Sequence, residues 1–211
     1  MKCPLKFIAI AGNIGAGKSS LTKALANYYD IETCYESVDD NPYLDDFYGD
    51  MKAYSFKLQV YFLSKRFENH QSINRGFKQV VQDRSIYEDY FIFARNLYEQ
   101  GKMDERDYNN YCDLFNVMSQ FLKPPDLIIY LKASINTLVE RIHKRGRDYE
   151  KTIPLEYLKQ LNILYERWVN DFKNYPFLTI NVDNLDFISE PEDLDYIISQ
   201  IHEYAALTVS K

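Results

Sequence analysis

The sequence has few of the residues that build metal centres, disulfide-bonded folds or nucleic-acid surfaces. Its 211 residues include three cysteines and three histidines, all isolated, so we expect neither a zinc site nor a disulfide framework. Scattered cysteines suit a reducing compartment, and we expect a cytoplasmic protein. The formal net charge of −6 argues against binding to DNA or RNA, which needs a basic face, but it does not exclude small anionic ligands.

Long apolar runs are also absent. The first run, Phe7 to Ile10, is too short to span a membrane, and a glycine-rich loop follows it before any cleavage site of a secretory signal could. We therefore expect no membrane partner. The length and the hydrophobic share of 46% fit one domain over residues 1–211. Aromatic residues are abundant, with 19 tyrosines and 13 phenylalanines. Most of them belong in a core, and a few could stack on a flat ligand such as a nucleobase.

Short strand-like runs alternate with stretches of helical spacing along the chain. The runs predicted as strands are 6–11, 32–36, 77–82, 127–131 and 177–182. The stretches predicted as helices are 19–29, 44–76 with a break near Gly49, 86–99, 104–121, 134–144, 154–173 and 190 to the end. Ser134 is the expected N-cap of its helix. This alternation predicts a parallel five-stranded sheet covered by helices on both faces, which is a three-layer α/β fold.

Directly after the first predicted strand, the sequence satisfies the whole G-x-x-x-x-G-K-[ST] phosphate-loop pattern. Its glycines let consecutive N–H groups turn toward phosphate oxygens, and the helix that follows adds its positive dipole end. Lys18 can reach the β- and γ-phosphates, and Ser19 can place its hydroxyl on Mg²⁺. The strand–loop–helix context favours a nucleotide site over a turn that binds nothing. The residues of the loop are Gly12, Asn13, Ile14, Gly15, Ala16, Gly17, Lys18 and Ser19.

Charged residues follow two other predicted strands. Glu36 ends the second, and Asp83-Arg84-Ser85 ends the third. Because the carboxyl ends of parallel strands meet at one edge of a sheet, these residues should converge on the loop. A carboxylate there can take the proton of a hydroxyl acceptor, and Arg84 can orient that carboxylate. The alternative is that they are solvated loop charges.

Three arginines, Arg141, Arg145 and Arg147, form a further basic cluster. Arg141 and Arg145 are one helical turn apart and share a face. A mobile flap that carries these side chains would supply the positive charge that phosphoryl transfer needs. The alternative is a basic helix end that the helix dipole stabilises.

Several motifs occur together in the order typical of one family. They are the phosphate loop, Glu36-Ser37-Val38 with Asn41-Pro42-Tyr43-Leu44, Asp83-Arg84-Ser85 and the arginine flap. With these motifs the chain resembles the deoxyribonucleoside kinases, from the loop to about Trp168, and most of all the small bacterial members that act on deoxyadenosine or deoxyguanosine. The resemblance implies a P-loop kinase fold with an arginine-rich lid at about 141–152, ATP with Mg²⁺ as the donor, and a deoxyribonucleoside as the acceptor.

The resemblance also implies roles for individual residues. Glu36 would be the base that activates the nucleoside 5′-hydroxyl, and Arg84 would bond the 5′-oxygen and keep Glu36 charged. Asp83 would lie beside Mg²⁺ together with Ser19. The donor side would be completed by Arg141, Arg145, Arg147, Asp186 and Phe187, the last two near the adenine of ATP.

On the acceptor side, Tyr48 and Glu150 would bond the sugar 3′-hydroxyl, to which they can together donate and accept. Gln59 would bond the edge of the base. Arg66 and Asp89 would form an acid–arginine pair that addresses an exocyclic amino group, a feature that thymine lacks. The plain alternative for Gln59 and Arg66 is a position on the surface of a helix.

Phe93 fits the position that stacks on the base, unless it belongs to the core. We expect transfer of the γ-phosphate of ATP to the 5′-hydroxyl, with deoxyadenosine ranked first, then deoxyguanosine and deoxycytidine. The resemblance further implies a homodimer.

Two other functions stay open at this point. A thymidylate-type monophosphate kinase shares the sheet and the loop, but it needs a basic site for the acceptor phosphate, which Glu36 and Asp83 would repel. A catalytically silent nucleotide-binding subunit would have no need of Glu36 and Arg84. The chain departs from many animal relatives in two places, with Ser37 where they have proline and Asp83 where they have glutamate.

Overall fold

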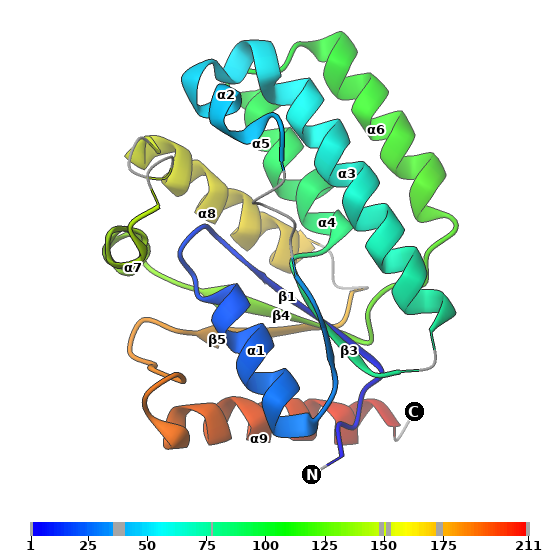
Figure 1. Cartoon of the computed structure of the whole chain (residues 1–211), viewed down its shortest axis with the longest axis vertical. Helices are drawn as coiled ribbons and strands as arrows, with labels where there is room; N and C mark the ends of the chain where they lie inside the picture. Colours follow the sequence, from blue (N-terminus) through cyan, green and yellow to red (C-terminus); the bar gives the residue numbers. More distant parts are fainter. Residues whose placement is uncertain are drawn as a thin grey trace.

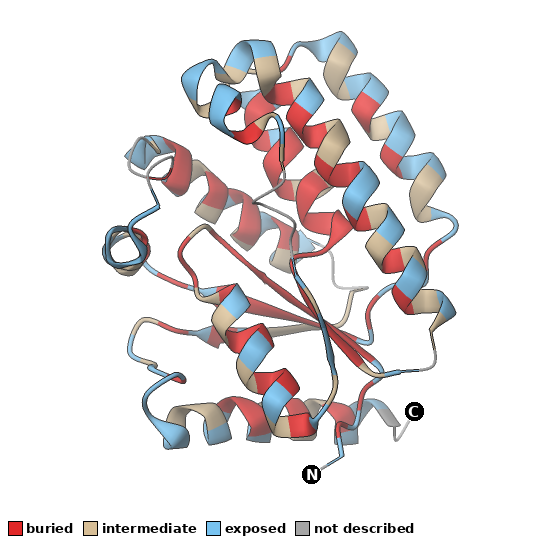
Figure 2. Ribbon diagram, viewed as in Figure 1, coloured by how far each residue is buried: buried red, intermediate tan, exposed pale blue. Residues whose placement is uncertain are grey.

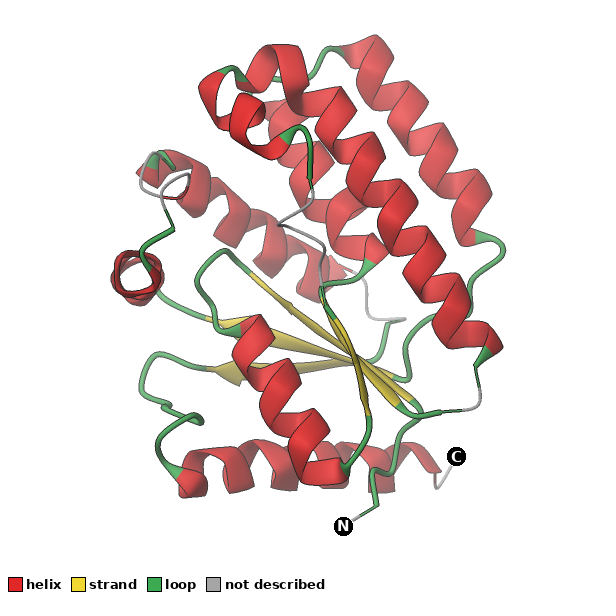
Figure 3. Cartoon of the chain, in the orientation of Figure 1, coloured by secondary structure: helices red, strands yellow, loops and turns green. Residues whose placement is uncertain are grey.

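The computed structural model describes residues 2–35, 41–76, 78–147, 150, 153–171 and 175–209. Within these residues the centre is a five-stranded parallel sheet with the strand order β2-β3-β1-β4-β5, drawn in yellow in Figure 3. The strands are β1 (Phe7–Gly12), β2 (Glu32–Cys34), β3 (Val80–Asp83), β4 (Leu127–Lys132) and β5 (Phe177–Asn181). The central strands β1, β3 and β4 are buried almost throughout, whereas the edge strands are more exposed (Figure 2).

Helices cover both faces of this sheet (Figure 1). One face carries α2 (Leu44–Gly49), α3 (Met51–Arg75), α4 (Ile86–Glu88), the π-helical segment η1 (Asp89–Ala94), α5 (Arg95–Glu99), α6 (Glu105–Ser119) and α8 (Leu155–Asp171). The opposite face carries α1 (Lys18–Tyr29), α7 (Ile135–Arg145) and α9 (Pro191–Val209). The expected three-layer α/β fold is therefore confirmed.

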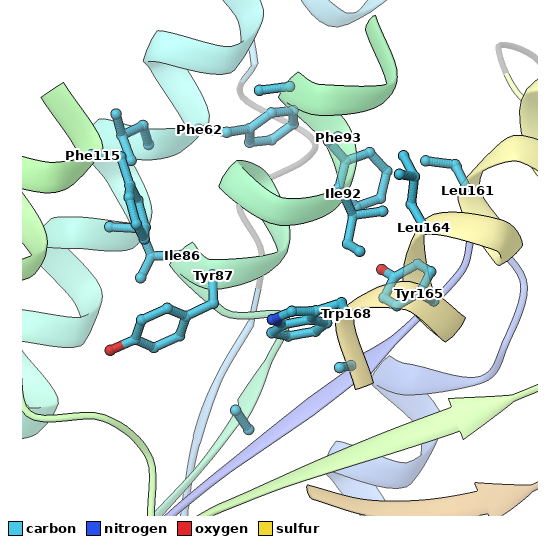
Figure 4. Close-up of a cluster of buried hydrophobic side chains, with 14 of the residues drawn as sticks. Phe62, Ile86, Tyr87, Ile92, Phe93, Phe115, Leu161, Leu164, Tyr165 and Trp168 are labelled. Carbon is cyan, nitrogen blue, oxygen red and sulfur yellow. The ribbon is translucent and has the colours of Figure 1, made fainter. Parts of the chain in front are cut away.

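The alternation of side chains along β1 shows how the sequence builds two cores. Phe7 and Ala9 pack into the cluster under α3 and α8, whereas Ile8 and Ile10 pack into the cluster under α1 and α9. Neighbouring side chains of a strand point to opposite faces, so a continuous apolar run fills both cores at once. In the larger cluster the aromatic residues interleave, and Figure 4 shows Trp168 of α8 below Tyr165 in the same layer.

Most predicted boundaries agree with the structure to within two residues. The break near Gly49 is confirmed, because Asp50 caps α3 and accepts hydrogen bonds from the N–H groups of Lys52 and Ala53, both at 3.1 Å. Ser134 caps α7 as expected, accepting from the N–H of Thr137 at 3.3 Å.

Three predicted elements differ from the structure. The strand expected over 77–82 begins at Val80 and runs to Asp83, and the strand expected over 32–36 ends at Cys34. The helix expected over 86–99 is interrupted by the six π-helical residues of η1. Among the described residues, no helix combines the length and the apolar character that crossing a membrane requires.

Candidate active site

Two cavities meet at the carboxyl edge of the sheet, where β1 and β3 end. The first has a volume of about 290 Å³ and is lined by residues of α2, α3, η1 and the end of β3. The second has a volume of about 460 Å³ and lies between the N-terminus of α1, α7 and the segment 185–188. Gly15, Lys18, Ser19, Arg145 and Arg147 line both of them. The loop after β1 thus separates two connected binding spaces.

The glycines of this loop adopt backbone conformations that other residues rarely reach. Gly15 has a φ of +85°, and a Cβ on it would lie 2.8 Å from the carbonyl oxygen of Leu138. Gly17, with a φ of +97°, stands directly against the ring of Phe187. The loop can therefore curl tightly between α7 and the sheet only with glycine at these positions.

Asn13 fixes the loop to the protein rather than facing a cavity. Its side-chain amide donates to the carbonyl of Leu158 at 2.9 Å and to Oδ1 of Asn162 at 2.6 Å, and its own Oδ1 accepts from the N–H of Ile14 at 2.7 Å. Lys18 Nζ donates to the carbonyl of Asn13 at 2.9 Å. The main chain of the loop, not the Asn13 side chain, is thus available to phosphate oxygens.

Asp83 and Arg84 stand at the end of β3, beside the loop. Ser19 Oγ donates to Asp83 Oδ2, and Asp83 Oδ1 is buried with no hydrogen-bond partner among the described residues. A carboxylate oxygen left over beside a loop hydroxyl fits Mg²⁺, which commonly uses one or two carboxylates plus substrate phosphates. Across the part of the chain that the structure describes, no three histidine, cysteine, aspartate or glutamate side chains gather in a way that could hold a metal ion.

Arg84 has a left-handed backbone, with a φ of +64°. For a residue other than glycine this conformation costs roughly 1–3 kcal/mol and is typical of functional sites. Its N–H bonds the carbonyl of Ile10 at 3.0 Å, and its guanidinium lies 4.1 Å from the centre of the Phe93 ring. The turn directs the side chain into the first cavity.

The acceptor-side residues expected from the resemblance line or adjoin the first cavity. Arg66 Nη1 donates to both carboxylate oxygens of Asp89, at 2.5 and 2.6 Å, and both side chains are almost fully buried. Gln59 is buried too, and its Oε1 has no hydrogen-bond partner among the described residues. Neither Gln59 nor Arg66 is a surface residue, so that alternative is wrong.

The π-helical segment η1 carries Asp89 and Phe93. A π-helical turn is rare and often marks a functional site, because it widens the helix locally. Asp89 and Phe93 both line the first cavity, while Phe93 also belongs to the core.

Glu150 connects the lid arginines to the first cavity. Arg145 donates to it at 2.5 and 2.9 Å, and Arg147 lies 3.6 Å from it. Tyr48 lines the same cavity. Residues 148–149 and 151–152 of the expected lid lie outside the described residues.

Arg141 differs from the other two arginines, since its guanidinium bonds main-chain carbonyls. It donates to Ala16 at 3.2 Å, Val182 at 2.7 Å and Leu185 at 3.1 Å, while it also lines the second cavity. Arg141 therefore ties the phosphate loop to the segment 182–185.

The two residues expected near the donor adenine line the second cavity. Phe187 is buried against Gly17. Asp186 accepts from the N–H groups of Ile188 and Ser189, both at 3.2 Å, and these hydrogen bonds keep the pKa of Asp186 below its usual value.

One expected residue and two unexpected ones complete the description. Glu36 lies outside the described residues. Glu88 and Tyr165 are not among the predicted site residues, and they meet behind the phosphate loop with their oxygens 2.6 Å apart. The Ser85-x-x-Glu88 spacing of a capping box was a signal for Glu88, but nothing local points to Tyr165.

A phosphate loop at a helix N-terminus, an Asp–Arg pair at the next strand end and arginines around a second cavity define a P-loop phosphotransferase. A sequence model described as "Deoxynucleoside kinase" matches residues 8–206. The chain belongs to the deoxynucleoside kinase family, and the protein is a kinase. The predicted family and activity are confirmed, and the thymidylate-type kinase and the silent subunit are not supported.

Relatives with assigned names cover most of the chain. It is 46% identical over 197 residues to deoxyadenosine kinase of Dictyostelium discoideum, covering 93% of this chain and 79% of that one. It is 39% identical to deoxyadenosine/deoxycytidine kinase of Bacillus subtilis (strain 168), covering 92% and 90%. It is 41% identical to deoxyguanosine kinase of Lactobacillus johnsonii, also covering 92% and 90%.

Solved structures agree with this assignment. The structure of deoxyadenosine kinase from M. mycoides with bound dCTP superposes with a TM-score of 0.83 at 32% identity, covering 93% of this chain and 99% of that one. The same enzyme with bound dATP gives the same TM-score, identity and coverage.

Proposed function

We propose that this kinase transfers the γ-phosphate of ATP to the 5′-hydroxyl of deoxyadenosine, and less efficiently of deoxyguanosine and deoxycytidine, to give the 5′-monophosphate for deoxynucleotide salvage. The observation that carries the proposal is that Gln59 and Asp89 line the same cavity as Lys18 and Ser19. A base-recognition group and a phosphate loop within one cavity suit a nucleoside whose 5′-end points at the donor.

The preference for an amino-bearing base is supported by the buried pair at the end of the cavity. Asp89 is an acceptor for an exocyclic amino group, and Arg66 orients it through two hydrogen bonds. Gln59 has a free acceptor, Oε1, and its amide NH₂ can donate, so it can form hydrogen bonds with the edge of a purine or of cytosine. Adenine, guanine and cytosine each carry an exocyclic amino group, whereas thymine has none.

Within this proposal each residue has a defined task. Glu36 takes the proton of the 5′-hydroxyl, and Arg84 bonds the 5′-oxygen. Lys18 places its charge beside the transferring phosphate. Ser19 and Asp83 would hold Mg²⁺, which would supply neutralising charge to the phosphates. Catalysis is then mainly alignment plus charge neutralisation.

The sugar and the lid complete the arrangement. Tyr48 and Glu150 bond the 3′-hydroxyl, and Arg145 and Arg147 close on the triphosphate. The remaining donor contacts come from the loop main chain, Arg141, Asp186 and Phe187.

The same proposal includes one domain over residues 1–211, a cytoplasmic location and a homodimer. The location is supported by three free cysteines. The dimer is supported by exposed apolar side chains on and just after α6, namely Leu114, Val117 and Phe121, which are 38%, 59% and 70% exposed. Sedimentation should give a dimer that Val117→Asp converts to a monomer, and a monomeric wild type would contradict it.

One assay tests the central proposal. Labelled phosphate transfer from ATP is measured with the four deoxynucleosides and with thymidylate as acceptors. Deoxyadenosine should give the highest kcat/KM and thymidine the lowest. A preference for thymidine or thymidylate, or no product with any acceptor, would contradict the proposal.

The role of Glu36 is tested separately. Glu36→Gln should lower turnover by about 10²- to 10⁴-fold, as expected for the loss of a general base, with ATP binding near normal. Glu32→Gln on exposed β2 is the matched control. A Glu36→Gln variant with wild-type turnover would refute the base assignment.

A further inference from the structure

Glu88 is a fully buried carboxylate that lines neither cavity. Its Oε1 accepts from the N–H of Gly12 at 3.2 Å, and its Oε2 accepts from the N–H of Ser85 at 3.0 Å. Gly12 opens the phosphate loop, and Ser85 directly follows Arg84. One carboxyl group therefore bonds the donor loop and the acceptor-side motif at the same time.

Tyr165 of α8 adds a third contact to this junction. Its hydroxyl lies 2.6 Å from Glu88 Oε1 and 2.8 Å from the carbonyl oxygen of Gly12. Glu88 thus accepts from the N–H of Gly12, and the single hydroxyl proton of Tyr165 is shared between Glu88 Oε1 and the carbonyl oxygen of Gly12. Figure 4 places Tyr165 in the interior layer between α8 and the helix that carries Ile92.

The neighbourhood of Glu88 shows why the position matters for the reaction. Burial raises the pKa of Glu88, while the nearby charges of Arg84 and Lys18 and the hydrogen bonds from Tyr165 and Ser85 act in the opposite direction. The two cations that influence Glu88 are the ones expected at the transferring phosphate. The Arg84 backbone is strained, so neighbouring hydrogen bonds must hold it in place. These are the bond from the N–H of Arg84 to the carbonyl of Ile10 and the bond from the N–H of Ser85 to Glu88.

We propose that Glu88 and Tyr165 are positioning residues that fix the spacing between the phosphate loop and Arg84 for phosphoryl transfer. The proposal rests on the proposed kinase reaction. Neither residue touches a substrate; they act through Gly12 and through the peptide that follows Arg84.

The chemistry of the side chain explains why a carboxyl group is needed at Glu88. Two backbone N–H groups from different segments require two acceptor oxygens, and a carboxyl group has them. Glutamine has the same shape but only one acceptor oxygen, so its NH₂ must face either Gly12 or Ser85. A buried N–H then loses its partner, and the segment that carries it can shift.

Steady-state kinetics of Glu88→Gln, Tyr165→Phe and the double variant test the proposal. Misplacement of reacting groups by about 1 Å can cost roughly 100-fold, so Glu88→Gln should lower kcat by about 10- to 100-fold. Tyr165→Phe should lower it by about 3- to 10-fold, and the KM for each substrate should stay within about threefold in both. Because the two residues act as a unit, the double variant should resemble Glu88→Gln rather than multiply the two losses.

Tyr130→Phe is the matched control. Tyr130 stacks on Tyr165 with ring centres 5.3 Å apart, and its hydroxyl bonds Glu166 at 3.1 Å, away from the loop. It should keep wild-type kcat. If Tyr165→Phe also keeps wild-type kcat, or if the losses multiply in the double variant, the proposal is wrong. Tyr165→Phe leaves both N–H bonds to Glu88 in place. The kcat of this variant therefore tests the positioning role even where Glu88→Gln does not fold.

Amide hydrogen exchange gives a readout that does not depend on turnover. In Glu88→Gln the N–H of Gly12 or of Ser85 should exchange at least tenfold faster than in the wild type, whereas Tyr130→Phe should change neither. Unchanged exchange at both would overturn the inference. A wild-type chain that phosphorylates no deoxynucleoside contradicts the proposed function, and exchange at these two amides then still tests the junction.

Discussion

The buried ion pair between Arg66 and Asp89 gives opposite expectations for a single and a double substitution. The two side chains are 4% and 1% exposed. Removing one partner leaves an uncompensated buried charge and costs about 3–5 kcal/mol, whereas apolar replacements of both are often neutral or stabilising. Asp89→Ala should therefore lower the free energy of unfolding by about 3–5 kcal/mol. Arg66→Met/Asp89→Leu should come within about 1 kcal/mol of the wild type or exceed it.

The kcat/KM of these variants should not change in parallel with their free energy of unfolding. A hydrogen bond to a charged group contributes about 1.5–3 kcal/mol, which corresponds to roughly 10- to 150-fold in kcat/KM. Both variants should therefore lose at least about tenfold in kcat/KM for deoxyadenosine, including the double variant that has recovered its stability.

Trp168 is the single tryptophan of the chain and is buried, so its fluorescence reports urea unfolding. Glu99→Ala is the control, because the Arg95–Glu99 pair on α5 has a similar N–O distance of 2.8 Å but is 45% and 36% exposed. Glu99→Ala should lower the free energy of unfolding by less than about 1 kcal/mol and leave kcat/KM for deoxyadenosine unchanged. If Asp89→Ala costs no more than this control, or if the double variant is as unstable as Asp89→Ala, the burial argument is refuted. An unchanged kcat/KM for deoxyadenosine would refute the role in base recognition.

The remaining predictions concern the loop and the pH dependence of stability. Gly15→Ala should raise the KM for ATP at least about tenfold, because the added Cβ would lie 2.8 Å from a carbonyl oxygen of α7. Gly101→Ala is the control, since Gly101 has a comparable φ of +65° but no atom within 4 Å of the added Cβ. This control should lower the free energy of unfolding by only about 1–2 kcal/mol. Equal KM values in the two variants would contradict this. Burial lowers the pKa of His70 below 6.5, so the unfolded chain binds the proton more tightly. The free energy of unfolding should then fall as the pH drops from about 6.5 toward the folded pKa, and His70→Gln, but not exposed His143→Gln, should remove that slope. A denaturant series between pH 5 and pH 8 in which all three proteins show the same slope would contradict it.

The layers of the fold could be predicted because they depend on local patterns. Apolar runs such as Leu127–Leu131 alternate with helical spacing, and this alternation permits few arrangements. The π-helical turn at Asp89–Ala94 could not be predicted in the same way. A period of 3.6 residues fits the sequence around it. The wider turn lies where η1 contacts both α3 and α8, and no local pattern encodes those contacts.

The site residues also differ in whether a local sequence pattern predicts them. The residue spacing from Gly12 to Ser19 is itself enough to predict a phosphate loop between a strand and a helix, and the structure has this loop between β1 and α1. Glu88 and Tyr165 could not be found from local patterns because their partners are far away in sequence: Glu88 is 76 positions from Gly12 and 77 positions from Tyr165. The capping-box spacing indicates a helix start at Ser85, but it does not indicate that Glu88 is buried or that it bonds Gly12.

The shared lining of the two cavities determines which substitutions can separate the donor from the acceptor. Lys18, Arg145 and Arg147 line both cavities, and Arg145 and Arg147 also contact Glu150, which lines only the first. Under the proposed function, a change at either arginine alters the surroundings of both substrates, because it removes positive charge from the proposed donor side and one cationic partner of Glu150 from the proposed acceptor side. Effects on one substrate alone are therefore expected only at residues that line a single cavity, such as Gln59 for the nucleoside.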